Sequence, residues 1–240
     1  MGISGKRYQD AIKFSRRRCK MKKLRWLLLL TLLSPFVLHA DVLDELFSTR
    51  NPARLEALIE TYQLSAEKDP QALKIVGVAW HQLALDKKDK AAKQAVESLS
   101  RYCQSAPDDM QALAWLGSSW AMLARDSSAV YKKITYVNKG LAMLDKAVNA
   151  ASDNYQVRVL RASVTYSVPD MFDRKKMAFE DYLYLTSHFP LSPDHQSEFY
   201  YKLGVLAEDA GKASQANEFF KKSVSADEKS EWANKSKGKL

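Results

Sequence analysis

The sequence predicts an all-α protein, built as an α-solenoid of helix-turn-helix repeats. The first observation is a recurring frame around Gly77, Gly117 and Gly204, with Arg161 in the equivalent place of one further unit; these positions lie 40, 44 and 43 residues apart. The second is an amphipathic segment after each of them. The third is that no strand-like alternation of any length competes with the helical pattern. Together they favour stacked helix pairs.

The frame places apolar or bulky residues four before, one before and three after each of these positions, which is the spacing of one helix face. The residues are Leu73, Val76 and Trp80; Leu113, Leu116 and Trp120; Val157, Leu160 and Val164; and Tyr200, Leu203 and Ala207. Second helices are predicted at about 89–103, 134–151, 174–188 and 213–226. A single helix pair cannot bury its apolar face, so neighbouring pairs are expected to share one continuous core.

Gly117 stands inside the predicted helix of "LAWLGSSWAML", where glycine costs about 0.5–1 kcal/mol relative to alanine. Because glycine recurs at the equivalent position of other units, we expect a contact there that offsets this cost. We expect a neighbouring helix to approach closely where the side chain is absent. At Arg161 the side chain must instead bend aside.

These residues resemble the tetratricopeptide-repeat (TPR) family, whose first helix carries W-x2-L-G-x2-Y. Leu113, Leu116, Gly117 and Trp120 match that pattern; the last unit adds Ala216 and Phe220 after Tyr200, Leu203 and Gly204, with Gly211 at the turn. Pro107 and Pro190 follow second helices, as the family's terminal proline does. The spacings exceed the family's 34 residues, so the excess is assigned to longer turns at 125–133 and 167–176. A HEAT-type solenoid, with repeats of about 40–47 residues, is the alternative.

Residues 1–40 read as an N-terminal extension and a secretory signal peptide. They hold ten Lys and Arg against a single acid, Asp10, while the rest of the chain has equal numbers of basic and acidic residues. A basic stretch precedes an apolar run from Trp26 to Leu38, with a small residue at Ala40, which is the layout of an export signal. We expect cleavage near Ala40 and a periplasmic protein. An uncleaved membrane anchor is the alternative, and either Met1 or Met21 could be the start.

Because the excess positive charge of +9 belongs to the leader, the body gives no electrostatic reason to expect nucleic acid as a partner. After the leader we expect an N-terminal helical cap over 41–69, the TPR-like array of about four units over 70–230, and a polar C-terminal tail over 231–240. The tail reads as a capping helix to about Ala233, and the alternative is a basic docking tail.

No set of residues after the leader predicts catalysis, a metal or a cofactor. His81, His188 and His195 have no metal-ligand spacing, and no Gly-rich phosphate loop is present. Cys103 near the end of an amphipathic helix is expected to be a small buried apolar residue rather than a nucleophile. We therefore expect a protein that is not an enzyme.

The resemblance implies a concave surface formed by the first helices of successive units. Its residues are expected one step round the helix from the core frame: Lys74, Val78 and His81; Ala114, Ser118 and Met122; Arg158, Ala162 and Thr165; and Tyr201, Val205 and Glu208. Lys74 and Arg158 lack an asparagine partner, so no carboxylate clamp is predicted. Trp80, Trp120 and Tyr200 are expected in the core and Tyr201 on the exposed face, whereas Trp115 is ambiguous.

Two functions fit these expectations. The first is a periplasmic, non-catalytic adaptor or scaffold, whose concave face holds a peptide segment or helix of a cell-envelope protein. The second is a solute-binding accessory of a transporter. In that case the turns 125–133 and 167–176 would fold over a pocket rimmed by aromatic residues such as Trp115 and Tyr131.

Overall fold

The structure is a computed structural model that describes the backbone from residue 35 and the side chains from residue 42 to residue 240. The leader predicted over residues 1–40 falls mostly on residues 1–34, which lie outside this description. The chain divides into two units after Glu45, and the second, residues 46–240, is compact. The repeat array belongs to the second unit.

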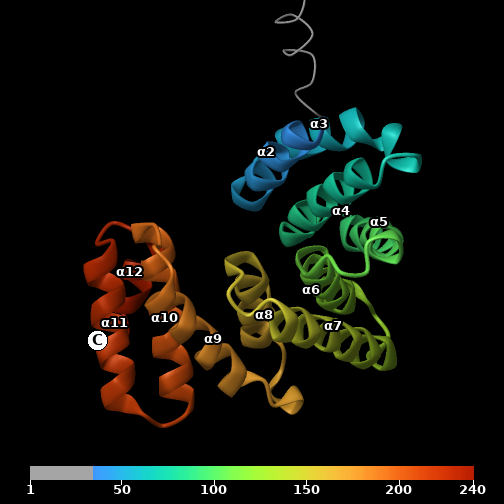
Figure 1. Cartoon of the computed structure of the whole chain (residues 1–240). Coiled ribbons are helices and arrows are strands. Elements are labelled where there is room, and N and C mark those ends of the chain that lie inside the picture. Colours follow the sequence, from blue (N-terminus) through green and yellow to red (C-terminus); the bar gives the residue numbers. More distant parts are fainter. Residues whose placement is uncertain (1–34) are drawn as a thin grey trace, which may run out of the picture. The chain divides into compact units, whose positions relative to one another are not determined.

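Residues 35–240 form helices joined by turns and contain no strand. The helices, coloured along the chain in Figure 1, are α2 (Pro35–Ser48), α3 (Pro52–Gln63), α4 (Pro70–Leu85), α5 (Ala91–Ser105), α6 (Met110–Asp126), α7 (Val130–Ala150), α8 (Tyr155–Ser167), α9 (Lys175–His188), α10 (Pro193–Asp209), α11 (Ala213–Ala226) and α12 (Glu231–Lys237). Short 3₁₀ turns lie at Ser65–Glu67 and Asp170–Phe172. The all-α prediction is confirmed.

The predicted helix pairs are α4–α5, α6–α7, α8–α9 and α10–α11, each packed against its own partner. Between pairs, α5 packs on α6, α7 on α8 and α9 on α10, so the chain stacks its helices in sequence order. Within residues 35–240 no helix is both long and apolar enough to cross a membrane.

A polar side chain caps the first helix of every pair. Asp69, Asp109, Asn154 and Ser192 each accept a hydrogen bond from a backbone N–H in the first turn of the helix that follows. Such a cap satisfies one of the four N–H groups that a helix start leaves without a partner. The second helices α5, α7, α9 and α11 have no side-chain cap. The caps therefore mark where each repeat begins.

The glycines of the frame stand where the two helices of a pair touch. A Cβ atom on Gly77 would lie 2.7 Å from Leu99 Cγ, and one on Gly204 would lie 2.5 Å from a ring carbon of Phe220. Neither space admits a methyl group unless the neighbour moves. The close approach predicted at these positions is confirmed.

The connection between α10 and α11 follows the predicted glycine turn. Gly211 has φ +72°, donates its N–H to Glu208 O, and is followed by Lys212, whose N–H bonds to Ala207 O. These two hydrogen bonds form a Schellman motif, which ends the helix at a left-handed glycine.

One predicted turn is wrong. We expected residues 125–133 to form a long turn, but α6 runs to Asp126 and α7 begins at Val130. The extra length of this repeat goes into α7, which has 21 residues. The second predicted turn, over 167–176, is a true connection: α8 ends at Ser167, a 3₁₀ turn follows, and α9 begins at Lys175.

The C-terminal residues form a longer helix than predicted, since α12 continues past Ala233 to Lys237. It packs on α10 and α11, and the Trp232 ring lies 5.6 Å from that of Tyr201. Lys235 pairs with Glu231 at 2.6 Å, and Lys239 pairs with Glu208 at 2.6 Å. The contacts of α12 are those of a capping helix.

Candidate functional site

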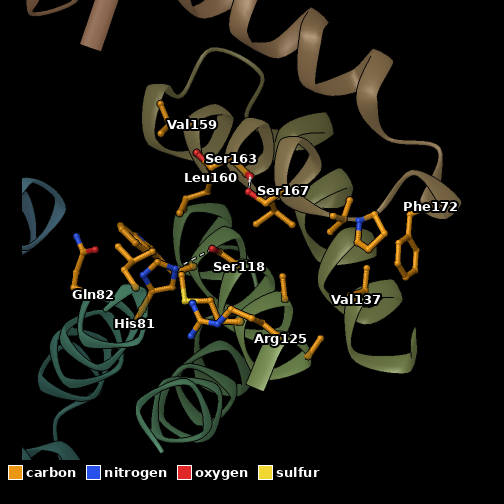
Figure 2. Close-up of a pocket in the computed structure, with 18 of the residues that line it drawn as sticks. His81, Gln82, Ser118, Arg125, Val137, Val159, Leu160, Ser163, Ser167 and Phe172 are labelled. Atoms are coloured by element: carbon orange, nitrogen blue, oxygen red, sulfur yellow. Dashed lines mark hydrogen bonds between the residues drawn. The ribbon is translucent and has the colours of Figure 1, made fainter. Parts of the chain in front are cut away.

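A cavity of about 710 Å³ lies within the array. Its walls come from α4, α6, α7, α8, the segment after α8 and the start of α10, together with Phe47 and Arg50. Figure 2 shows the part of the lining between His81 and Phe172. This volume lies within the roughly 300–1,000 Å³ of small-molecule sites in proteins. Most of the lining is apolar, including Phe47, Leu85, Trp115, Met122, Val130, Ile134, Val137, Val159, Leu160, Val164, Met171, Phe172 and Phe199.

His81 and Ser118 form a buried polar pair in the wall of the cavity. His81 Nε2 lies 2.9 Å from Ser118 Oγ, and the imidazole packs edge-on against Trp115 with 4.6 Å between ring centroids. His81 is 2% exposed, and its Nδ1 atom is buried with no hydrogen-bond partner. Burial, reinforced by the positive charges of Arg50 and Arg125, lowers the pKa of His81 to about 3. The ring is therefore neutral at physiological pH.

Two arginines stand at the same end of the cavity. Arg50 donates from Nη1 to Gln82 Oε1 at 2.8 Å, and Arg125 donates from Nη2 to the carbonyl of Ala84 at 2.7 Å. The Gln82 amide in turn donates to the carbonyls of Leu46 and Phe47. These hydrogen bonds attach both guanidinium groups to the C-terminal part of α4. Arg125 also pairs with Asp126 at 2.7 Å.

Aromatic residues continue the wall towards α8 and α10. The Phe47 ring lies 5.8 Å from Trp115 and 5.9 Å from Tyr155, in edge-on arrangements. The Tyr155 hydroxyl lies 3.3 Å from Nδ1 of His195. Burial, followed by the negative charge of Glu198, raises the pKa of Tyr155 to about 12, so its hydroxyl keeps its proton.

The cavity includes three of the predicted groove residues: His81, Ser118 and Met122. Lys74 and Val78 on α4 do not line it. Val78 is 1% exposed, and Lys74 reaches Asp109 instead, with Nζ 2.8 Å from Oδ2. Burial opposes the charge of Asp109, but hydrogen bonds from Lys74 and from the Ala112 N–H hold the pKa of Asp109 below its ordinary value.

Arg158 and Thr165 on α8 also lie outside the lining. Arg158 Nη1 and Arg161 Nε bond to the fully buried carboxylate of Asp181 on α9, at 2.8 and 2.7 Å. The Thr165 hydroxyl is buried and donates to the backbone of its own helix. Positions 158 and 161 share one helix face, which these ion pairs turn towards α9. The cavity is lined instead by Tyr155, Val159, Leu160, Ser163, Val164 and Ser167.

None of the three predicted groove residues on α10 lines the cavity, and Val205 packs partly buried against the core. Tyr201 packs against Phe220 and Trp232, and Glu208 is exposed beside Lys239. The cavity is reached instead by His195, Glu198 and Phe199, near the start of the helix. The groove predicted for the last unit is therefore displaced by about two helical turns.

Among the aromatic residues weighed from the sequence, Trp115 lines the cavity at 3% exposure, whereas Tyr131 is 70% exposed and does not. Trp80 and Tyr200 are half-buried against core residues. Trp120 is half-buried as well, with its ring 5.1 Å from that of Tyr136. Tyr201, expected on the exposed face, is half-buried as well. The sequence signal that could have assigned Trp115 is its place three residues before Ser118, on the same face of the helix.

The described residues show no cluster with the chemistry of a metal site: no group of three or more His, Cys, Asp or Glu side chains among them could hold an ion. Cys103 is half-buried rather than buried, and burial, followed by the charge of Asp109, raises its pKa to about 11. Its sulfur is thus a thiol at neutral pH, which is a poor nucleophile.

Comparison with known proteins finds likeness in structure alone. No protein-family model matches the chain, and no curated protein matches its sequence. The fold is similar to that of TTC0263, a thermophilic TPR protein of Thermus thermophilus, with 15% identity, a TM-score of 0.59, and coverage of 78% of this chain and 91% of that one.

Two structures of MamA are also similar. For MamA AMB-1 the identity is 18% and the TM-score 0.53, over 77% of this chain and 96% of that one. For MamA MSR-1 the values are 17% and 0.51, over 80% and 98%. With the helix pairs and the glycine contacts, these likenesses favour TPR over HEAT geometry. Residues 46–240 have the fold of a tetratricopeptide-repeat α-solenoid.

Proposed function

We propose that the protein is a non-catalytic adaptor or scaffold of the cell envelope, whose cavity receives an apolar segment of a partner protein. The observation that carries this proposal is the cavity itself, whose walls are mostly apolar. TPR-type arrays present such concave surfaces to peptides and helices, and this general property is brought here by analogy of fold. In this arrangement the partner's side chains enter the cavity while its backbone stays at the mouth.

The mouth of the cavity supports an apolar partner. Val130 and Met171 line it and are 70% and 72% exposed, and Leu85 and Ile134 line it at 36% and 37%. Apolar side chains left in water forgo the free energy of burial, about 25 cal/mol for each Å². A partner that covers them would recover it.

In-cell photo-crosslinking tests the adaptor proposal. A photoreactive phenylalanine analogue is placed at Val130 or Met171, and, as matched controls, at Leu64 or Leu183, which are exposed apolar residues outside the cavity. We expect one envelope protein to be crosslinked from the cavity positions and not from the controls. Crosslinks that are equal from all four positions, or absent from the cavity positions, would refute the proposal.

Export is the second part of the proposal and rests on the leader sequence. A basic stretch, an apolar run and Ala40 have the order of a cleaved signal. Fractionation of intact cells, with mass spectrometry of the mature N-terminus, is expected to place the protein in the periplasm with its first residue near Asp41. A cytoplasmic protein that begins at Met1 or Met21 would contradict this part.

A solute-binding accessory of a transporter is the second candidate. It is favoured by the connection after α8, because Val168, Pro169, Met171 and Phe172 line the cavity. The other turn that this hypothesis expected, at 125–133, is mostly helix, and Tyr131 does not line the cavity. A thermal-shift screen separates the two candidates, since a small ligand that binds the folded state alone raises Tm.

A further inference from the structure

Several hydrogen-bonding groups in the walls of the cavity are already bonded within the protein. Ser118 is bonded to His81, Ser167 donates to the carbonyl of Ser163 at 2.7 Å, and the Gln82 amide is engaged with Leu46 and Phe47. A peptide backbone placed there would carry an N–H and a C=O for nearly every residue, and burying these without partners is costly. A hydrocarbon chain has no such groups. The interior therefore suits an alkyl chain better than a polypeptide.

Arg50, His81, Gln82 and Arg125 form one polar group around the C-terminal part of α4, whereas Lys133, Ser163, Ser167, His195 and Glu198 are spread over the other walls. In Figure 2 Gln82 and His81 lie on one side of the cavity and Val137 and Phe172 on the opposite side, with Ser118 and Arg125 between them. The Nδ1 atom of His81 is buried and without a partner. An occupant with one polar head and an apolar tail matches this division.

The charges in the lining favour a negative head. Arg50, Arg125 and Lys133 are its cations, and Glu198 is its single carboxylate. Glu198 is already bonded to Lys202 at 2.6 Å, while Asp126, which pairs with Arg125, lies outside the lining. Guanidinium groups bind carboxylates well, because two parallel N–H groups match the two carboxylate oxygens.

From these observations we infer that the cavity binds a long-chain carboxylate, the anion of a fatty acid, with its head at Arg50 and Arg125 and its alkyl chain along Val159 and Val164 towards Phe172. This inference rests on the second candidate under the proposed function and names its ligand class. The exposed Val130 and Met171 would then cover the chain at the mouth.

Titration calorimetry with the full chain tests this inference. The probes are dodecanoate, dodecanol and dodecyltrimethylammonium, each below its micelle-forming concentration, so that the chain is constant while the head is negative, neutral or positive. We expect saturable one-to-one binding of dodecanoate, affinity for dodecanol weaker by about tenfold or more, and no saturable binding of the cation.

Matched variants locate the head. Arg50→Gln combined with Arg125→Gln is expected to weaken dodecanoate binding by about tenfold or more and to leave dodecanol unchanged, whereas Arg101→Gln, on the exposed face of α5, changes neither. Ala121→Phe, which fills the cavity, should abolish binding of both. Met171→Lys at the exposed mouth provides a second block if Ala121→Phe proves unfolded by circular dichroism.

Binding of all three probes with equal affinity, or binding that the arginine and cavity variants leave unchanged, would overturn the inference. Absence of dodecanoate binding together with a protein crosslinked from Val130 and Met171 would also overturn it, and would leave the adaptor proposal standing. Failure of the crosslinks together with head-selective binding would instead refute the adaptor and support the inference.

Discussion

Gly117 of α6 and Gly140 of α7 lie against each other, and each backbone fills the space of the other's missing side chain. A Cβ on Gly117 would lie 2.8 Å from Gly140 O, and a Cβ on Gly140 would lie 2.5 Å from Gly117 O. The neighbours are backbone atoms, which cannot turn aside as a side chain can. This contact fixes the distance between two helices that both line the cavity.

Gly117→Ala is therefore expected to destabilise the protein, although alanine is the better helix former. The added methyl group overpacks the contact, so the free energy of unfolding should fall by about 1–3 kcal/mol, and Gly117→Leu should cost more. Urea unfolding measures it. Gly238→Ala is the control, because its Cβ would meet its nearest atom at an ordinary 3.5 Å. A Gly117→Ala protein as stable as the parent would refute the assigned contact.

Asp181 is expected to be a major contributor to the stability of the third repeat. Its buried carboxylate compensates Arg158 and Arg161, which are 13% and 11% exposed. Asp181→Ala leaves the largely buried Arg158 without its carboxylate partner and leaves Arg161 only the longer pair with Asp145, at 3.6 Å. We expect a loss of about 3–5 kcal/mol in denaturant unfolding.

The control for Asp181 is Glu97→Ala, which removes an exposed pair with Lys93 and should cost at most about 1 kcal/mol. Similar losses in the two variants would mean that the Asp181 ion pairs contribute no more than a surface pair.

His81 gives the protein a pH dependence of stability. In the unfolded chain its pKa is near 6.5, whereas burial lowers it to about 3 in the folded state. Below pH 6.5 the unfolded chain therefore binds a proton that the folded state excludes, so stability falls as the pH falls. Between pH 7 and pH 5 we expect this group to cost about 2 kcal/mol.

Comparing the parent with His81→Phe isolates this contribution. The interval from pH 5 to pH 7 lies above the ordinary pKa values of Asp and Glu side chains, so carboxyl groups contribute little to the difference. The slope of unfolding free energy against pH should be smaller in the variant. Equal slopes would show that the imidazole is not excluded from protonation in the folded protein.

Much of the fold could be predicted from the sequence, because the frame around Gly117 reports contacts inside each helix pair. The predicted second helix at 213–226 coincides with α11 (Ala213–Ala226), and Gly211 forms the predicted turn. The turn at 125–133 could not be placed in the same way. Residues 130–133 are exposed, so no buried apolar stripe marks them as helix in the sequence, and the first turn of α7 instead contributes Val130 and Lys133 to the cavity.

The site was predictable only on α4 and α6. His81 and Ser118 lie one step from the frame and face each other across successive units. On α8 the position one step from the frame is Arg158, which was predicted to line the groove. Its ion pair with Asp181 turns that face of α8 towards α9 instead. Which face of α8 points towards the cavity thus depends on Asp181, a partner 23 residues after Arg158 in the sequence. The periodicity of α8 alone carries no information about that partner.

The most direct test of the central claim, that the cavity is where this protein binds its partner, is a crosslinking measurement in cells. The photoreactive residue stays at Met171, and the yield of crosslinked partner is compared in chains with and without Ala121→Phe, which fills the cavity. We predict that the filled cavity loses most of the crosslinked partner while circular dichroism shows the same helical fold. An unchanged yield in the folded variant would contradict the account.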